Sequence, residues 1–191
     1  MTALPEYVHP LTAREYAALP EDDGVRYELA EGWLMMSPRL IPRHQKGIRE
    51  LGRQLVPQLP GYEVLQEVDI DLQLAPPDAP GTVRVPDIVV VTREAFQRVD
   101  GDGTLLRASE VLLAVEFFSP GSTRIDTVVK HHEYADAGIG HYWMIDLHDG
   151  PSLVACHLAG EFGYQNADPV DGVFTTAEPF GVRVDLDALL A

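Results

Sequence analysis

Short apolar runs separated by turns dominate the chain. Apolar and acidic side chains alternate toward the end of residues 62–74, which is typical of a strand with one buried face. Four further runs are short and almost continuously apolar, as in strands buried on both faces. These runs span residues 84–91, 111–118, 141–146 and 153–158. We expect the last two strands to pair with each other.

Helix and hairpin signals lie between these runs. Thr12 followed three residues later by Glu15 is a capping box, which marks the start of a helix. Residues 26–30 and 33–37 predict a hairpin around a Glu-Gly turn. The expected helices span residues 13–19, 42–56, 94–98 and, from a cap at 122 or 123, to about 137. This order of elements indicates a single mixed α/β domain across residues 1–191.

Charge limits the possible partners of the chain. The 14 Lys and Arg against 30 Asp and Glu give a formal net charge of −16, which argues against broad affinity for nucleic acid. Five of the basic residues nevertheless fall within 15 positions: Arg39, Arg43, Lys46, Arg49 and Arg53. Such a run is most often a solvated helix face, but it can also bind a phosphate backbone weakly and in a salt-sensitive way.

Other classes are excluded or disfavoured by composition. The single cysteine, Cys156, allows neither an internal disulfide nor a cysteine-based zinc site. The N-terminus lacks the basic and apolar regions of a signal peptide, and no apolar run reaches membrane-spanning length. We therefore expect a cytoplasmic protein that does not associate with membranes.

Two carboxylates stand out because each lies in an apolar run. Asp87 follows Pro86 at the start of Ile-Val-Val-Val, and Glu116 is the only polar residue within Leu112–Phe118. A lone buried acid is unfavourable unless something neutralises it. Adjacent strands that aim both carboxylates at one place predict a divalent metal held by oxygen ligands. The structural alternatives are an acid at a strand end for Asp87 and an ion pair with Arg84 or Lys130 for Glu116.

The helix after Glu116 carries the other candidate groups. Asp126, Lys130 and Tyr134 follow one another at intervals of four residues and therefore share one helix face. A lysine there can orient a metal-bound water or offset charge on a phosphate in the transition state. An ordinary surface pair between Asp126 and Lys130 is the alternative.

These motifs form an ordered series over about residues 10–147. The series comprises Tyr27-Glu28-Leu29-x-x-Gly32, His44 in the following helix, Pro86-Asp87, Val115-Glu116, Ser119-Pro120-x-Ser122-Thr123-x-x-Asp126-x-x-x-Lys130-x-x-x-Tyr134-x-x-x-Gly138 and Tyr142-Trp143-x-x-Asp146. It resembles the Uma-type putative restriction endonucleases, a branch of the PD-(D/E)XK nuclease superfamily. The resemblance implies a restriction-endonuclease-like core, with an N-terminal hairpin and helices flanking a mixed sheet.

The resemblance also implies a Mg²⁺-dependent phosphodiesterase site. Asp87 and Glu116 would be metal ligands and Lys130 the catalytic lysine. The superfamily's simplest pattern has a lysine two residues after the acid, where this chain has Phe118, so Lys130 must supply the charge from the helix. Glu28 is a candidate third ligand through water, or else the partner of an arginine. His44 is expected at the edge of the pocket, or else as a hydrogen-bonded core histidine.

We interpret the sequence as an endonuclease that hydrolyses phosphodiesters in DNA with Mg²⁺ or Mn²⁺. The first alternative is a nuclease fold without cleavage activity, which serves as a binding or assembly module; the net charge and Phe118 favour it. A metal-dependent hydrolase of another phosphoester also fits the acidity but has no motif of its own. Because one small domain offers one site for two DNA strands, we expect a homodimer.

Overall fold

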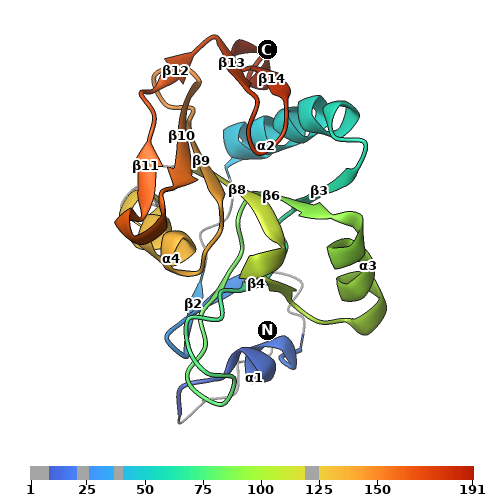
Figure 1. Cartoon of the computed structure of the whole chain (residues 1–191), viewed down its shortest axis with the longest axis vertical. Helices are drawn as coiled ribbons and strands as arrows, with labels where there is room; N and C mark the ends of the chain where they lie inside the picture. The colour runs from blue at the N-terminus through green and yellow to red at the C-terminus, as the bar shows by residue number, and fades with distance from the viewer. Residues whose placement is uncertain (1–8, 21–25, 37–40, 119–124) are drawn as a thin grey trace.

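The computed structural model describes residues 9–20, 26–36, 41–118 and 125–191. It is a mixed α+β structure, as expected from the sequence (Figure 1). The helices are α1 (Ala13–Ala17), α2 (Pro42–Leu55), α3 (Arg93–Asp102) and α4 (His131–Asp136). Short 3-10 turns lie at Val56–Gln58, Ala108–Glu110, Gly160–Phe162 and Asp187–Leu189. No helix in these ranges has the length and apolar character needed to cross a membrane.

The larger sheet has seven strands. They are β3 (Tyr62–Gln66), β6 (Ile88–Thr92), β8 (Val111–Phe118), β9 (His141–Asp146), β10 (Ser152–Leu158), β11 (Tyr164–Asn166) and β12 (Val170–Asp171). The order is β11-β10-β9-β8-β6-β3, and β12 also pairs with β10. The pair β8–β9 is parallel, whereas the other pairs are antiparallel. The expected pairing of β9 with β10 is confirmed.

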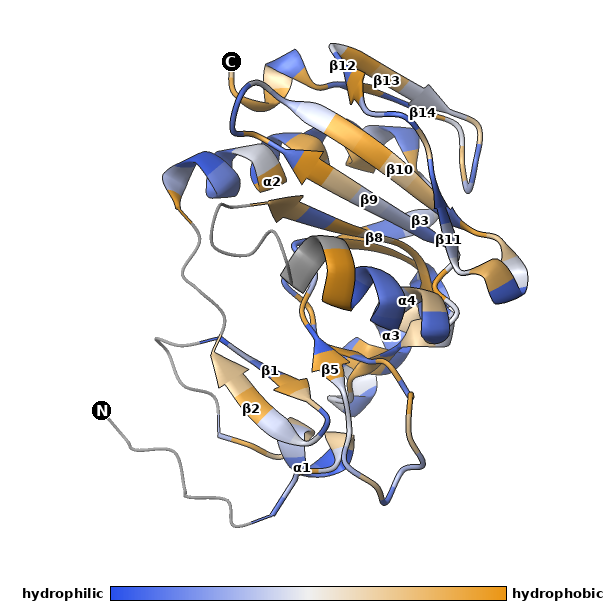
Figure 2. Ribbon diagram, turned by 90° about the vertical axis from the view of Figure 1, so that its left-hand side faces the viewer, coloured by the Kyte–Doolittle hydropathy of each residue, from blue (hydrophilic) through white to orange (hydrophobic). Residues whose placement is uncertain are grey.

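A smaller sheet of five strands lies below the large one in Figure 2. Its strands are β1 (Tyr27–Ala30), β2 (Trp33–Met36), β4 (Ile70–Asp71), β5 (Val83–Arg84) and β7 (Leu106–Arg107), in the order β2-β1-β5-β4-β7. The expected hairpin is β1–β2, in which Ala30 pairs with Trp33. Near the C-terminus, β13 (Val173–Thr176) and β14 (Val182–Asp185) form a separate hairpin.

Two apolar layers cover the faces of the large sheet. On one face, α2 packs its buried side chains against β6, β8 and β9, and the β13–β14 hairpin joins the same cluster. The other face holds residues of α3 and α4 together with apolar residues of β4 and β7. Alternation along the strands separates the layers: Val115 and Phe117 belong to the first, and Ala114 to the second. Glu116 therefore points to the face that α4 covers.

The expected single strand over residues 84–91 is wrong in one respect. Val83–Arg84 pairs within the small sheet and Ile88–Thr92 within the large one, so the chain changes sheets at Val85-Pro86-Asp87. Proline lacks a backbone N–H and cannot continue a ladder inside a sheet, which explains the break at Pro86. The extended segment 62–74 divides in the same way, near Glu67, whose φ is +53°.

The helix expected to end near residue 137 has an unusual first part. Ile125–Lys130 is a π-helical turn, and α4 continues it as an α-helix. Its expected caps, Ser122 and Thr123, lie outside the described residues. Elsewhere the capping box of Thr12 and Glu15 is confirmed, and α3 extends beyond the expected 94–98 to Asp102, where Gly103 with a φ of +61° forms the C-cap. Single π-helical turns are often found where a side chain has a functional position.

Candidate active site

Asp87 directly precedes β6, and Glu116 lies in the neighbouring strand β8. Ile88, the residue after Asp87, pairs with Val115, the residue before Glu116, in the antiparallel β6–β8 ladder. The backbone N of Phe117 donates to Asp87 Oδ2 at 2.7 Å, which fixes this carboxylate at the strand junction. Both acids are buried, at 2% and 4% exposure.

Lys130 reaches Glu116 from the helical segment that follows β8. Its Nζ atom lies 2.7 Å from Glu116 Oε1 and 2.9 Å from Glu28 Oε1, and the lysine is buried. The Tyr134 hydroxyl donates to the same Glu116 oxygen at 3.0 Å. The expectation that Lys130 and Tyr134 share a face near Glu116 is therefore confirmed. The side chain of Asp126, the third member of that series, lies outside the description.

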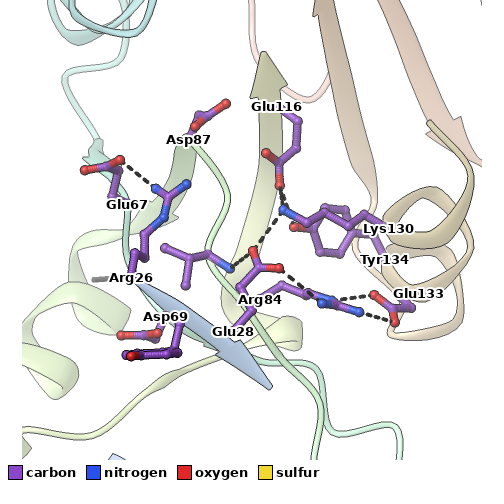
Figure 3. Close-up of polar contacts among 12 residues, drawn as sticks. Arg26, Glu28, Glu67, Asp69, Arg84, Asp87, Glu116, Lys130, Glu133 and Tyr134 are labelled. Atoms are coloured by element: carbon purple, nitrogen blue, oxygen red, sulfur yellow. Dashed lines mark hydrogen bonds and ion pairs between the residues drawn. The ribbon is translucent and has the colours of Figure 1, made fainter. Parts of the chain in front are cut away.

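Glu28 is held from three directions (Figure 3). Oε1 accepts from Lys130 and from the backbone N of Val85 at 3.1 Å, and Oε2 accepts from Arg84 Nη1 at 3.1 Å. Arg84 in turn forms two bonds of 2.7 Å to the carboxylate of Glu133. Glu28 is thus the partner of an arginine, as its structural alternative held. Arg84, which the sequence suggested as a partner for Glu116, pairs instead with Glu28 and Glu133. The structural alternative for Glu116 is met by its ion pair with Lys130.

The electrostatics of this group follow from burial and close partners. Burial raises the pKa of Glu28, but Lys130 and Arg84 outweigh it, and the pKa lies below its usual value. Burial works against the charged form of Arg84, yet its bonds to Glu133 raise the guanidinium pKa above normal. Burial also raises the pKa of Tyr134 well above that of a free phenol, and Glu116 adds to the effect. Tyr134 is therefore a neutral hydrogen-bond donor.

Carboxylate chemistry makes Asp87 and Glu116 suitable ligands for a hard cation such as Mg²⁺. Both oxygens of Glu28 are already engaged, so this side chain suits the role of an anchor for Lys130 better than that of a direct ligand. In the described part of the chain, no three His, Cys, Asp or Glu side chains are gathered around one point as metal ligands. The assignment of Asp87 and Glu116 as metal ligands remains a prediction.

His44 lies on the opposite side of β8 from Lys130. It is buried on α2, and its ring centroid lies 6.4 Å from that of Phe117, whose side chain faces the α2 layer. Gly47 packs against the same phenyl ring, where an added Cβ would approach Phe117 to 2.9 Å. This position places His44 in a packed layer next to the strand end, and its role in the site stays a prediction.

The basic run on α2 is only partly available to a ligand. Arg53 and Arg49 both contact Glu50, at 2.7 and 3.2 Å, and Lys46 donates to the backbone O of Leu190 at 3.0 Å. Arg43 is exposed and forms no ion pair with any residue that the structure describes. Arg39 lies outside the described residues. Arg43 is therefore the basic side chain of this helix best placed to contact a phosphate.

Sequence reasoning named Arg84 only as an alternative partner of Glu116 and missed its pairing with Glu28 and Glu133. The signal that could have found Arg84 is a lone cation in the apolar stretch Val83–Val85, since a buried guanidinium needs carboxylate partners. Glu133 carries no comparable signal, because its side chain reaches Arg84 only through the placement of α4 beside β5.

The pattern of motifs is matched by a protein family. The model of the Uma2 family, described as "Putative restriction endonuclease", matches residues 13–186. The chain belongs to the Uma2 family. This membership supports nuclease function in general. The matched residues include the small sheet, the large sheet and both hairpins.

A solved structure with a similar fold extends the comparison. The crystal structure of a putative nuclease belonging to DUF820 from Anabaena variabilis ATCC 29413 has a TM-score of 0.70 to this Uma2-family chain. The two chains are 18% identical, and the similarity covers 95% of this chain and 98% of the other. At this identity the likeness concerns the fold. No curated protein matches the chain.

Proposed function

We propose that this chain is a metal-dependent endonuclease that hydrolyses phosphodiester bonds in DNA. The observation that carries the proposal is the buried Lys130 ammonium 2.7 Å from Glu116, with the buried carboxylate of Asp87 held by the backbone N of Phe117, the residue after Glu116. Family membership supports it independently. Each of the three groups comes from a different segment, namely the sheet junction, β8 and the π-helical turn.

In this proposal Asp87 and Glu116 hold Mg²⁺ or Mn²⁺. The metal, when bound, lowers the pKa of a water molecule and offsets negative charge on the phosphate. Lys130 contacts Glu116, and in this proposal its charge stabilises the negative charge that develops on the phosphate oxygens. Tyr134 and Glu28 fix the positions of Glu116 and Lys130 by the hydrogen bonds described above.

The test is a plasmid-nicking assay at low salt with and without Mg²⁺ or Mn²⁺, combined with Mn²⁺ calorimetry. Asp87→Asn keeps the shape of the side chain and removes its charge, so both metal binding and cleavage should be lost. Asp168→Asn, at an exposed position, is the matched control and should keep both. Wild-type protein that binds Mn²⁺ and DNA but never nicks the plasmid contradicts the proposed reaction.

A binding or assembly module without cleavage activity is the second candidate. The fully engaged carboxylate of Glu28, the net charge of −16 and Phe118 in the position of the usual lysine favour it. The two candidates differ in their response to metal. A module of this kind binds its partner equally well in chelator and in Mg²⁺, and Asp87→Asn leaves that binding unchanged.

We also propose that the protein acts as a homodimer, so that two sites serve the two strands of a duplex. Two-fold symmetry is the most common arrangement among soluble oligomers. Light scattering at micromolar concentration should give the mass of two chains, each of 21.1 kDa. A monomer under these conditions contradicts the dimer and leaves cleavage of a single strand as the expected reaction.

A further inference from the structure

A cavity of about 530 Å³ lies beside the candidate active site. It is bounded by α1, the start of β1, the link between β3 and β4, and the end of α3. Its polar lining includes Tyr16, Arg26, Glu67 and Asp69, and its apolar lining includes Val99 and Leu105. This volume is within the range of pockets that bind small organic ligands.

The carboxylate of Asp69 is fixed within this cavity. The Tyr16 hydroxyl donates to Asp69 Oδ1 at 2.6 Å and lies 2.8 Å from the backbone O of Tyr27. Burial raises the pKa of Asp69, although the hydrogen bond from Tyr16 opposes this change. A half-buried carboxylate of this kind is stabilised by an additional hydrogen-bond donor. Asp69 is therefore a hydrogen-bond acceptor that Tyr16 holds in place within the cavity.

The cavity and the candidate active site share their supporting segments. The backbone N of Glu67 donates to the backbone O of Asp87 at 3.3 Å, and Val85, which lines the cavity, donates to Glu28. The charge of Glu28 is close enough to contribute to the raised pKa of Asp69. Figure 3 shows Asp69 and Arg26 in the same close-up as Asp87 and Glu116.

The charged side chains that line the cavity limit the kind of ligand that it can bind. Arg26 is paired with Glu67 at 2.6 Å and its charge also acts on Asp69, so two carboxylates face one guanidinium in the cavity lining. A carboxylate repels phosphate but accepts hydrogen bonds from amino groups, as it does from the N4 amino group of cytosine. Apolar walls and two tyrosines suit the flat faces of an aromatic ring.

We propose that this cavity binds one nucleobase next to the phosphodiester that is cut, and that Asp69 selects bases with an amino edge. Tyr16 is a positioning residue, because it holds the carboxylate through its hydroxyl. The inference rests on the proposed function for its substrate. A base inside a stacked duplex does not enter such a cavity, so the substrate strand is single-stranded or presents an everted base.

Binding of neutral nucleosides tests the inference without relying on catalysis. Deoxycytidine and thymidine are compared by ligand-observed NMR with the full chain in EDTA. Wild-type protein should bind deoxycytidine about tenfold more tightly than thymidine, which lacks an amino group. Asp69→Asn should abolish this preference, and Asp168→Asn should retain it. Val99→Phe should reduce binding of both nucleosides, because the added ring occupies part of the cavity while Asp69 is unchanged.

The same proteins are then assayed for cleavage of single-stranded oligonucleotides that differ in the base beside the scissile bond. Faster cleavage beside cytosine, lost in Asp69→Asn, supports the inference. Equal binding of both nucleosides by wild-type protein overturns it, and so does an unchanged preference in Asp69→Asn when thermal unfolding shows that the variant is folded. Cleavage without any base preference also overturns it and leaves the proposed nuclease intact. Selective nucleoside binding without any cleavage supports nucleobase binding by the cavity and contradicts the proposed nuclease activity.

Discussion

Lys130 Nζ and Glu116 Oε1 lie 2.7 Å apart, with both side chains buried. The pair joins the π-helical turn to β8, a central strand of the large sheet. A buried ion pair is by itself weak evidence of function, because desolvation opposes the attraction between the charges. The proposed function requires a second carboxylate near this pair, and the buried Asp87, which accepts a hydrogen bond from the backbone N of Phe117, is the candidate for it.

Lys130→Ala should lower the turnover number for DNA cleavage about 10²- to 10³-fold while Mn²⁺ binding persists. The amine acts on the transition state, whereas the carboxylates bind the ion. Lys46→Ala is the matched control, since Lys46 is the only other lysine of the chain, and it should cleave like wild type at saturating DNA. Because Lys130→Ala leaves two buried carboxylates without an ammonium, calorimetry and nicking are performed below its unfolding temperature. Loss of Mn²⁺ binding in a folded Lys130→Ala protein contradicts this division of roles.

Arg84→Met should lower the free energy of unfolding by about 3–5 kcal/mol, because it leaves Glu28 and Glu133 without their buried guanidinium. Arg49→Met is the control: its ion pair with Glu50 has an arginine that is 67% exposed, so the change should be below about 1 kcal/mol. Urea unfolding followed by circular dichroism measures both. Equal effects of the two substitutions contradict the structural role of Arg84.

Glu110 predicts a pH dependence of stability. Its hydrogen bonds to Arg98 lower the carboxyl pKa in the folded state, whereas the unfolded chain has a pKa of about 4.3. The contribution is therefore fully present above the unfolded pKa and is lost as the pH falls through the folded one. The difference in unfolding free energy between wild type and Glu110→Gln should be largest near neutral pH and shrink below about pH 4. A difference that does not change with pH contradicts this role of the Glu110–Arg98 pair.

Arg43→Ala should weaken DNA binding and reduce the salt dependence of the binding constant. Each lost phosphate contact in duplex DNA lowers the slope of log K against log salt by about 0.9. Turnover at saturating DNA should change little, because Arg43 lies on α2 and not among the proposed catalytic groups. Arg107→Ala, an exposed change on the small sheet, is the control. Fluorescence anisotropy over a range of salt concentrations gives both slopes, and identical slopes contradict a DNA-binding role for α2.

Local signals in the sequence identified much of the fold and part of the site. Thr12 and Glu15 form their capping box because its two hydrogen bonds involve residues only three positions apart. The regular spacing of Lys130 and Tyr134 likewise placed both near Glu116. The family resemblance supplied the roles of these residues, which no spacing could provide.

Contacts set by tertiary packing could not be derived in this way. Pro86 marked a break, but no local pattern shows that the strands before and after it belong to different sheets. The bonds between Arg84 and Glu133 join residues 49 positions apart and depend on how α4 packs beside the small sheet. The position of His44 behind Phe117 is also a packing outcome, because helical spacing predicted its buried face but not its neighbour.

The change of sheets at Pro86 has a consequence for thermal behaviour. Glu28 and Arg84 belong to the small sheet, whereas Glu116 belongs to the large one, so Lys130 bridges two separately hydrogen-bonded units. The small sheet has short strands and a limited apolar cluster around Leu29 and Val83, which are features of regions that open before the whole molecule unfolds. Heat inactivation should therefore precede loss of the main β-sheet signal, and amide hydrogens of β1 and β5 should exchange faster than those of β8.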